Sequence, residues 1–322
     1  MEQFRTYSPE DIILSNLEET SNRLASVFEQ ELAHLSELAK ELIDTPEIDK
    51  TSFPLLSDIL PPFSNLSSED HLATNNELLY KLERIHSTQK KLLLGRAIRI
   101  QCGLSPNDPP LAEIDDEQDK REDFLNPRIV YPKNSFTDSA YLCFASLFPS
   151  PRALYAHSYV SSCEDVFNGI GELCILPIEN AAEGRLIGFL KLINRFGLRI
   201  IATCDISSSA GDKNTAFALL SKYPDIDFVA STDGQCRYLE IAYPFDQELP
   251  SIAEVLTAAQ LCGLHLKKIH TLPSQEASDG GNICHAVFEI DPESDPTTFL
   301  IYLAMEVPQY SLVGIYPHLQ IR

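Results

Sequence analysis

The chain has 322 residues, with 47 acidic against 25 basic side chains and a formal charge of -22. This balance argues against nucleic acid or an anionic membrane as a partner, because both require a cationic surface. The apolar fraction of 44% excludes a wholly disordered chain. At roughly 100–200 residues per domain the length predicts two or three domains. We find neither a signal-like leader nor an apolar run of about 18 residues, and so expect a soluble, cytoplasmic protein.

Residues 1–103 are predicted to be all-helical. Residues 10–45 contain neither Pro nor Gly and follow a near-heptad of apolar positions, so we expect one helix of about 50 Å that needs partner helices. Ser21 and Glu31 are polar residues at two positions of this apolar repeat. They either fix the register of the helix packing, form part of a site, or leave a solvated gap between the helices. A second helix is expected from the cap signature at Ser67 to Gly103.

Residues 104–127 are rich in acidic residues and proline. This composition predicts a linker between domains, with an acidic docking tail as the alternative.

From residue 128 the pattern changes to short β-rich runs that alternate with helical stretches, which indicates a small α/β unit with a parallel sheet. The expected strands are 128–131, 152–156, 173–177 and 198–204, and the expected helices are 138–148, 164–170 and 184–195.

The last part, 223–322, has the order of a ferredoxin-like βαββαβ fold. The expected strands are 236–243, 264–272, 282–290 and 311–316, and the expected helices are 250–262 and 296–307.

Cysteine and histidine spacing predicts neither a metal site nor a cofactor. The eight cysteines include no Cys-x-x-Cys pair, and most lie in apolar runs, so we expect buried free thiols. Cys163 has the least apolar setting, which is weak evidence for a nucleophile. His265, His270 and His285 fall in two predicted strands, where they are either ordinary strand residues or facing metal ligands.

The segment Leu176–Gly184 is the most informative part of the sequence. It follows a predicted strand and opens a predicted helix, so Glu179 and Asn180 are expected at the carboxyl end of the strand, where open α/β sheets bind ligands. Asn180 or a free backbone N–H at the helix start would hold a substrate carboxylate. The alternative is a capped helix start without a ligand.

The stretch Pro177-Ile178-Glu179-Asn180, with Gly184, resembles the Pro-Ile-Glu-Asn-Ser-x-x-Gly signature of prephenate dehydratase. Asn214-Thr215-Ala216-Phe217 is similar to that family's Asn-x-Thr-Arg-Phe, and Pro132–Thr137 is similar to its Gly-Pro-x-Gly-Ser-Tyr-Ser turn. The last domain resembles the family's ACT regulatory domain, above all in Val313–Pro317. The helical part is placed like the chorismate mutase domain of the bifunctional P-protein, and His86–Gln89 resembles the end of its third helix.

The resemblance implies a layout and a set of site residues. The chain would be a multidomain α and α/β protein, with a chorismate-mutase-like domain at 1–103, a truncated dehydratase-like lobe at 128–222 and an ACT-like domain at 223–322. Catalytic roles fall to Thr215, Thr137, Asn180 and Glu179. Substrate contacts fall to Ser135, Pro177, Gly184 and Gln89, and effector contacts to Ser251, His270 and Thr271.

The departures from the family pattern concern the chemistry. The family's second lobe is missing, because about eight residues join the exit strand to Thr215 and reach only about 28 Å when extended. Ala216 replaces the motif arginine, which is the usual clamp for a carboxylate such as those of prephenate. The mutase-like helices lack several cations, and Pro250-Ser251-Ile252 replaces the effector motif Gly-Ala-Leu.

Two hypotheses stay open. In the first, the chain is a catalytically degenerate relative of the P-protein with a binding or regulatory role, and it pairs as a homodimer through the ACT-like domain or the long helix. In the second, it is an active or residual prephenate dehydratase of phenylalanine biosynthesis whose cleft is completed by another subunit. Either way, a small dicarboxylate or an amino acid is the expected ligand.

Overall fold

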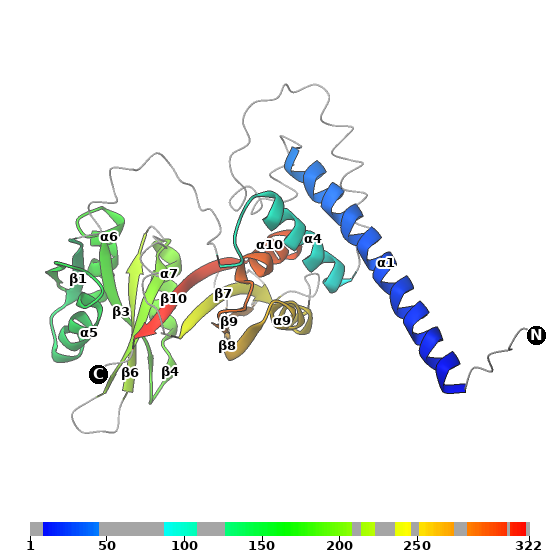
Figure 1. Cartoon of the computed structure of the whole chain (residues 1–322). Coiled ribbons are helices and arrows are strands. Elements are labelled where there is room, and N and C mark those ends of the chain that lie inside the picture. The colour runs from blue at the N-terminus through cyan, green and yellow to red at the C-terminus, as the bar shows by residue number, and fades with distance from the viewer. Residues whose placement is uncertain are drawn as a thin grey trace, which may run out of the picture.

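The computed structural model describes residues 9–44, 87–107, 126–207, 214–222, 236–245, 251–273, 282–307 and 310–319. Figure 1 shows a long N-terminal helix beside a mixed α/β body whose strands run through one extended sheet. None of the described helices combines the length and apolar character that a membrane span requires.

The long helix, α1 (Pro9–Asp44), packs against a shorter one, α4 (Thr88–Gln101). The contact buries Leu35, Leu38 and Leu42, which are three of the predicted heptad positions. Glu31 forms an ion pair with Lys90 of α4, in which both side chains remain partly exposed. Residues 67–86 of the second predicted helix lie outside the described residues, and α4 begins where Ser87 accepts a hydrogen bond from the backbone N–H of Lys90.

The α/β unit has its strands close to the predicted positions, but two of its helices begin earlier than the sequence suggested. Asn134 and Ser158 each form a capping box, and this fixes the first turns of α5 and α6 before the predicted starts of these helices. The elements are β1 (Arg128–Pro132), α5 (Ser135–Ala145), β2 (Arg152–Ala156), α6 (Tyr159–Phe167), β3 (Leu173–Asn180), β4 (Gly184–Arg185), α7 (Ile187–Arg195), β5 (Arg199–Ser207) and β6 (Asn214–Ser221).

The strands of this unit follow the order β2-β1-β3-β6-β5. β1 runs parallel to β2 and β3, whereas β6 is antiparallel to both β3 and β5. The four predicted strands therefore run in one direction, but the sheet is not wholly parallel: the two-residue β4 is antiparallel to β3, and β6 is antiparallel to both of its neighbours. The reason is that β6 follows β5 after a connection too short for a crossover, so the chain must reverse direction.

The C-terminal unit has the predicted βαββαβ order. Its strands are arranged β10-β7-β9-β8, and all neighbours are antiparallel. α10 and α9 pack against α4, where Arg99 is buried and bonds to Asp295 and Thr298. The elements are β7 (Arg237–Phe245), α9 (Ile252–Leu261), β8 (Leu264–Pro273), β9 (Asn282–Ile290), α10 (Pro296–Glu306) and β10 (Ser311–Leu319).

The two units share one sheet because β10 pairs in parallel with β5. In Figure 1 this strand runs from the C-terminal unit into the α/β unit. Gly314 lies opposite Ile200, and a Cβ at Gly314 would be only 2.2 Å from the Ile200 carbonyl oxygen. Glycine is thus required where the backbones meet. The predicted boundaries at 103, 127 and 222 stay predictions.

Candidate functional site

Thr137 uses its hydroxyl within its own helix. The side chain is fully buried, its Oγ1 donates to the Pro132 carbonyl oxygen at 2.5 Å, and it accepts from the Asn134 N–H at 3.1 Å. The bond with Asn134 completes the α5 capping box. A threonine has one hydroxyl hydrogen, so Thr137 has none left to donate to a substrate in this state.

Asn180 caps a turn rather than a helix. Its Oδ1 accepts from the backbone N–H groups of Ala182 at 2.9 Å and Glu183 at 2.6 Å, and the chain then returns as β4. The helix α7 begins only at Ile187. The expected carboxylate site at a helix start is therefore not formed here. Gly184, with φ +71°, supplies the left-handed residue of this turn.

Thr215 lies directly opposite Asn180 in the pairing of β3 with β6, and it is half-buried. Ala216 follows, flanked by Glu179 on β3 and Asp205 on β5. The position of the family's arginine is thus bordered by two acids. Both of these acids are already paired, as described below.

Pro177 and Ser135, which were expected to contact substrate, are placed by the packing of their own strand and helix. Pro177 is buried opposite Phe217, just before a register shift in β3. Ser135 is exposed at the first position of α5, where its carbonyl accepts from the Ser139 hydroxyl.

Four cations of the α/β unit were candidates to replace the motif arginine, namely Arg128, Lys133, Arg185 and Lys213, and two of them are paired with acids elsewhere. Arg128 pairs with Glu172 at the other end of β1, and Arg185 pairs with Glu240. Lys133 lies 4.8 Å from the centre of the Tyr155 ring, and it is the candidate cation left beside Asn134. Lys213 lies outside the described residues.

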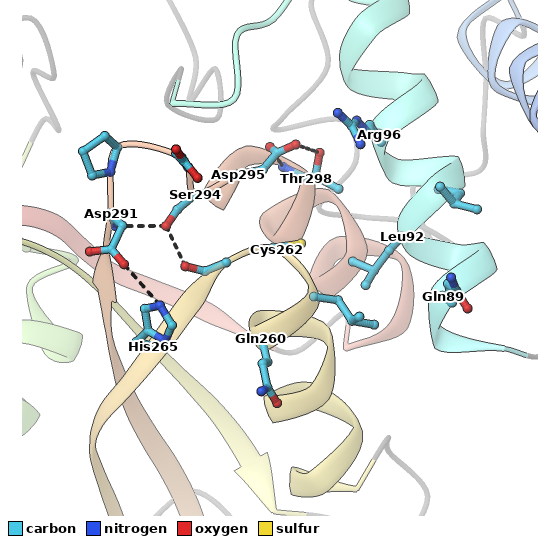
Figure 2. Close-up of a pocket in the computed structure, with 15 residues that line it drawn as sticks. Gln89, Leu92, Arg96, Gln260, Cys262, His265, Asp291, Ser294, Asp295 and Thr298 are labelled. Atoms are coloured by element: carbon cyan, nitrogen blue, oxygen red, sulfur yellow. Dashed lines mark hydrogen bonds and ion pairs between the residues drawn. The ribbon is translucent and has the colours of Figure 1, made fainter.

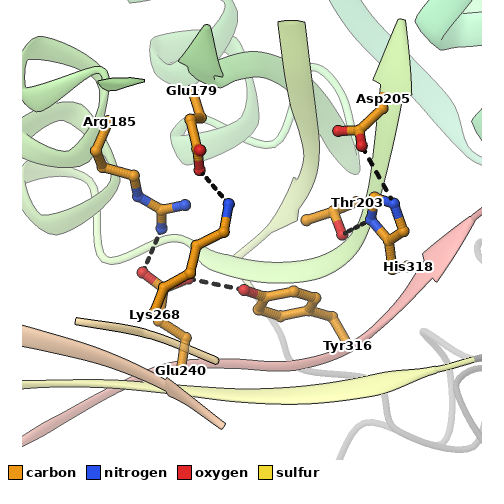
Figure 3. Close-up of polar contacts among 8 residues, drawn as sticks. All are labelled: Glu179, Arg185, Thr203, Asp205, Glu240, Lys268, Tyr316 and His318. Carbon is orange, nitrogen blue, oxygen red and sulfur yellow. Dashed lines mark hydrogen bonds and ion pairs between the residues drawn. The ribbon is translucent and has the colours of Figure 1, made fainter. Parts of the chain in front are cut away.

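The two units are held together by a polar cluster, which we call the seam cluster (Figure 3). At its centre is Glu240 of β7, which is fully buried. It accepts a hydrogen bond from Arg185 of β4 and another, at 2.8 Å, from the Tyr316 hydroxyl of β10. Arg185 itself is only 5% exposed. A charged pair of this kind is stable only because the partners are fixed by the surrounding sheet.

The pKa of Glu240 reflects this environment. Burial favours the neutral acid, but the charge of Arg185, together with His285 and the Tyr316 hydroxyl, outweighs burial and lowers the pKa to about 2. Burial beside Glu240 raises the pKa of Tyr316, so its hydroxyl stays protonated and donates.

Two further contacts of the seam cluster cover the strand ends of the α/β unit. Lys268 of β8 donates to Glu179 at 2.7 Å. His318 of β10 bridges two residues of β5, with Nδ1 3.1 Å from the Thr203 hydroxyl and Nε2 3.5 Å from the Asp205 carboxylate. The hydrogen bond from His318 is the main cause of the lowered pKa of Asp205. The C-terminal unit thus occupies the polar groups that surround Ala216.

His270 and His285 face each other across β8 and β9, as the sequence allowed, but His265 lies elsewhere, opposite Glu289 and paired with Asp291. Burial lowers the pKa of His270. Within the described residues no group of three or more His, Cys, Asp or Glu side chains has the arrangement of a metal site.

A cavity of about 750 Å³ lies between α4 and the C-terminal unit. In Figure 2, Gln89 and Arg96 approach it from α4, Gln260 comes from α9, and Asp291 lies on the loop before α10. Leu92 supplies part of its apolar wall. Gln89, which was expected to contact substrate, therefore lines a cavity. The facing wall of this cavity belongs to the C-terminal unit.

The predicted effector residues do not meet at this cavity. Ser251 caps α9 in a capping box with Glu254, and Thr271 is exposed on β8 opposite Cys284. Glu240 was not among the predicted site residues, although an acid inside the apolar strand run Tyr238–Tyr243 indicates a buried partner.

No protein-family model matches the chain, and no curated protein matches its sequence. Among solved structures, a prephenate dehydratase from Streptococcus mutans is 20% identical, with a TM-score of 0.48, over 61% of this chain and 100% of that one. A quorum-quenching acylase, GqqA, is 18% identical with a TM-score of 0.45, over 59% and 94%. A prephenate dehydratase from Arthrobacter aurescens in complex with L-Phe is 12% identical with a TM-score of 0.44, over 59% and 89%. Likenesses of this size give no support for a shared activity.

Proposed function

We propose that the chain is a prephenate dehydratase-like protein that has lost catalysis and acts as a binding or regulatory protein. The observation that carries the proposal is the seam cluster. Glu179 and Asp205, the two acids that flank Ala216, are paired with Lys268 and His318 of the C-terminal unit. A substrate at this position would have to displace contacts within the protein itself.

The local chemistry supports the same reading. Prephenate carries two carboxylates, and dehydration with loss of CO2 requires a group that helps hydroxide to leave. The Thr137 hydroxyl donates its hydrogen to the Pro132 carbonyl oxygen, and Asn180 Oδ1 accepts hydrogen bonds from the backbone of the turn. Only six residues, 208–213, separate β5 from β6, which is too few for a second lobe that would exclude water. Polar groups open to water lose most of their catalytic value.

The cavity beside α4 is where we place a small ligand. Arg96 and Gln89 would bind a carboxylate, and Leu92 would contact an apolar part. Because α4 forms one wall and the C-terminal unit the other, a ligand would stabilise the contact between them. This provides a binding role that does not involve the dehydratase motif.

The alternative function, a working dehydratase completed by another subunit, is favoured by one observation. Asn180 and Thr215 are neighbours across β3 and β6, and the Thr215 hydroxyl has no role in a helix cap. In that case a partner would have to supply both the missing wall and the cation.

The deciding experiment is phenylpyruvate formation from prephenate at high protein concentration, measured above the spontaneous rate. We expect no enzymatic turnover from the folded protein. Turnover that is abolished by Thr215→Ala, and preserved in the exposed control Ser139→Ala, would refute the proposal in favour of the alternative. A parallel thermal-shift titration with prephenate and with phenylalanine, in the native protein and in Arg96→Ala, tests the binding role. A shift that Arg96→Ala removes is expected.

A further inference from the structure

Two pairs of thiols are packed together in the α/β unit, one on each face of its sheet. Cys143 of α5 packs against the apolar cluster that contains Cys204 of β5, and Cys163 of α6 lies in one cluster with Cys174 of β3. In each pair the two thiols influence each other's pKa. The first pair belongs to the apolar cluster beneath α5, and the second to the cluster beneath α6 and α7. In both pairs one thiol lies on a helix and the other on a strand.

The pairs differ in their access to solvent. Cys163 and Cys174 are both 0% exposed. Cys204 is also 0% exposed, but Cys143, on the side of α5, is partly exposed. A small oxidant can therefore reach one member of the first pair and neither member of the second.

We propose that Cys143 and Cys204 form a peroxide-sensitive thiol pair, in which Cys143 is oxidised first and Cys204 then closes a disulfide between α5 and β5. The placement of the two residues gives each a distinct task. The partly exposed Cys143 meets the oxidant, and the buried Cys204 is in contact with it and with no solvent.

The acidity of the two thiols agrees with this division. The hydrogen bond from Cys204 lowers the pKa of Cys143, and this outweighs the opposing effect of burial. The same contact, with burial, raises the pKa of Cys204. The thiolate is the form that attacks an oxidant, so Cys143 is the more reactive member.

The reaction balances with hydrogen peroxide as the only oxidant. The Cys143 thiolate attacks one peroxide oxygen, the O–O bond breaks, and hydroxide leaves and takes up a proton as water. This produces a sulfenic acid. The Cys204 sulfur then attacks the Cys143 sulfur, an S–S bond forms, the S–O bond breaks, and the hydroxyl leaves with the Cys204 proton as a second water. Two thiols are oxidised, and one peroxide is reduced to two waters.

The position of Cys204 connects this chemistry to the junction of the two units. Cys204 lies opposite Leu319 in the pairing of β5 with β10, and its neighbour Asp205 contacts His318. A disulfide at Cys204 would tie α5 to the strand that joins the units. The redox state of the pair would therefore affect the seam cluster.

The test uses the full-length, reduced protein, treated with hydrogen peroxide and then blocked with N-ethylmaleimide. Non-reducing peptide mapping by tandem mass spectrometry follows the Cys143–Cys204 and Cys163–Cys174 cross-links. The Cys143–Cys204 link is expected to form at least about tenfold faster, because reactivity follows thiolate character and exposure. Equal rates for the two links would overturn the proposal. So would oxidation of Cys143 to the sulfinic acid while Cys204 remains a free thiol that N-ethylmaleimide then alkylates. Cys236, which is exposed, is mapped separately.

Two conservative variants keep the test independent of the mapping yield. In Cys204→Ser, Cys143 should stop at the sulfenic acid and react with dimedone. In Cys143→Ser, Cys204 should stay reduced under the same peroxide exposure. The matched control Cys163→Ser should leave the Cys143–Cys204 link unchanged. Rapid oxidation of Cys204 in Cys143→Ser would show that Cys143 is not the entry point and would refute the mechanism.

Discussion

Replacement of Glu240 by glutamine tests whether the seam cluster holds the two units together. The amide keeps the shape of the side chain but removes its charge, and Arg185, at 5% exposure, is left without a counter-ion. Removal of one partner from a buried ion pair typically costs about 3–5 kcal/mol. We expect Glu240→Gln to lose stability in this range. The loss should not exceed it, because the Tyr316 hydroxyl can still donate to the amide oxygen.

A matched control lies on the same antiparallel sheet. Lys267 and Glu289 form an ion pair whose lysine side chain is 46% exposed. Pairs of this kind contribute about 0–1 kcal/mol, so Glu289→Gln should have little effect. The double variant Arg185→Met with Glu240→Leu removes both buried charges, and it should be more stable than Glu240→Gln.

The assay is equilibrium unfolding in urea, followed by far-ultraviolet circular dichroism because the chain contains no tryptophan. The unfolding midpoint of Glu240→Gln should lie further from the native midpoint than that of Glu289→Gln, and an equal or smaller difference would refute a stabilising role of the buried pair. An unpaired charge is also refuted as the cause if the double variant is the least stable of the set.

Two further predictions concern the same junction. Gly314→Ala should destabilise the protein and expose the connection to proteolysis, because its Cβ would lie 2.2 Å from the Ile200 carbonyl oxygen. The control Gly188→Ala in α7 places a Cβ with nothing within 4 Å, so it should be neutral or stabilising in thermal melts. The pKa of Glu240 falls from 4.5 to about 2 on folding, so the stability it contributes is present above about pH 4.5 and lost as the pH falls toward 2. Thermal midpoints measured down this range should fall more steeply for the native protein than for Glu240→Gln, and equal slopes would contradict the assignment.

The sequence predicted the strands well because their signals are local. The run 282–290 was predicted with the bounds that β9 has, and 152–156 with those of β2. Helix starts were less accurate, because the capping boxes of Asn134 and Ser158 begin α5 and α6 three and five residues before the predicted starts at 138 and 164. A capping box stabilises a first turn through backbone contacts that hydrophobic periodicity does not register.

The site was harder to predict because it depends on contacts between distant residues. Thr137 and Asn180 are correctly read as polar residues at strand ends, but their hydrogen bonds to the local backbone decide whether they are available to a substrate. The pairing of β10 with β5 joins residues more than one hundred positions apart, as at Gly314 and Ile200. Sequence periodicity gives no information about such pairings.

The shared sheet also limits how this protein can respond to a ligand. A regulatory unit that closes over a cleft needs a hinge, and hinges lie in connections with few contacts. Here β10 and β5 are hydrogen-bonded, and Arg185, Lys268 and His318 cross the same boundary. Rigid rotation of one unit against the other would break these bonds together. Signals are therefore expected to act locally, at the cavity beside α4 or at the thiol pair on β5, and to change the stability of the junction rather than the angle between the units.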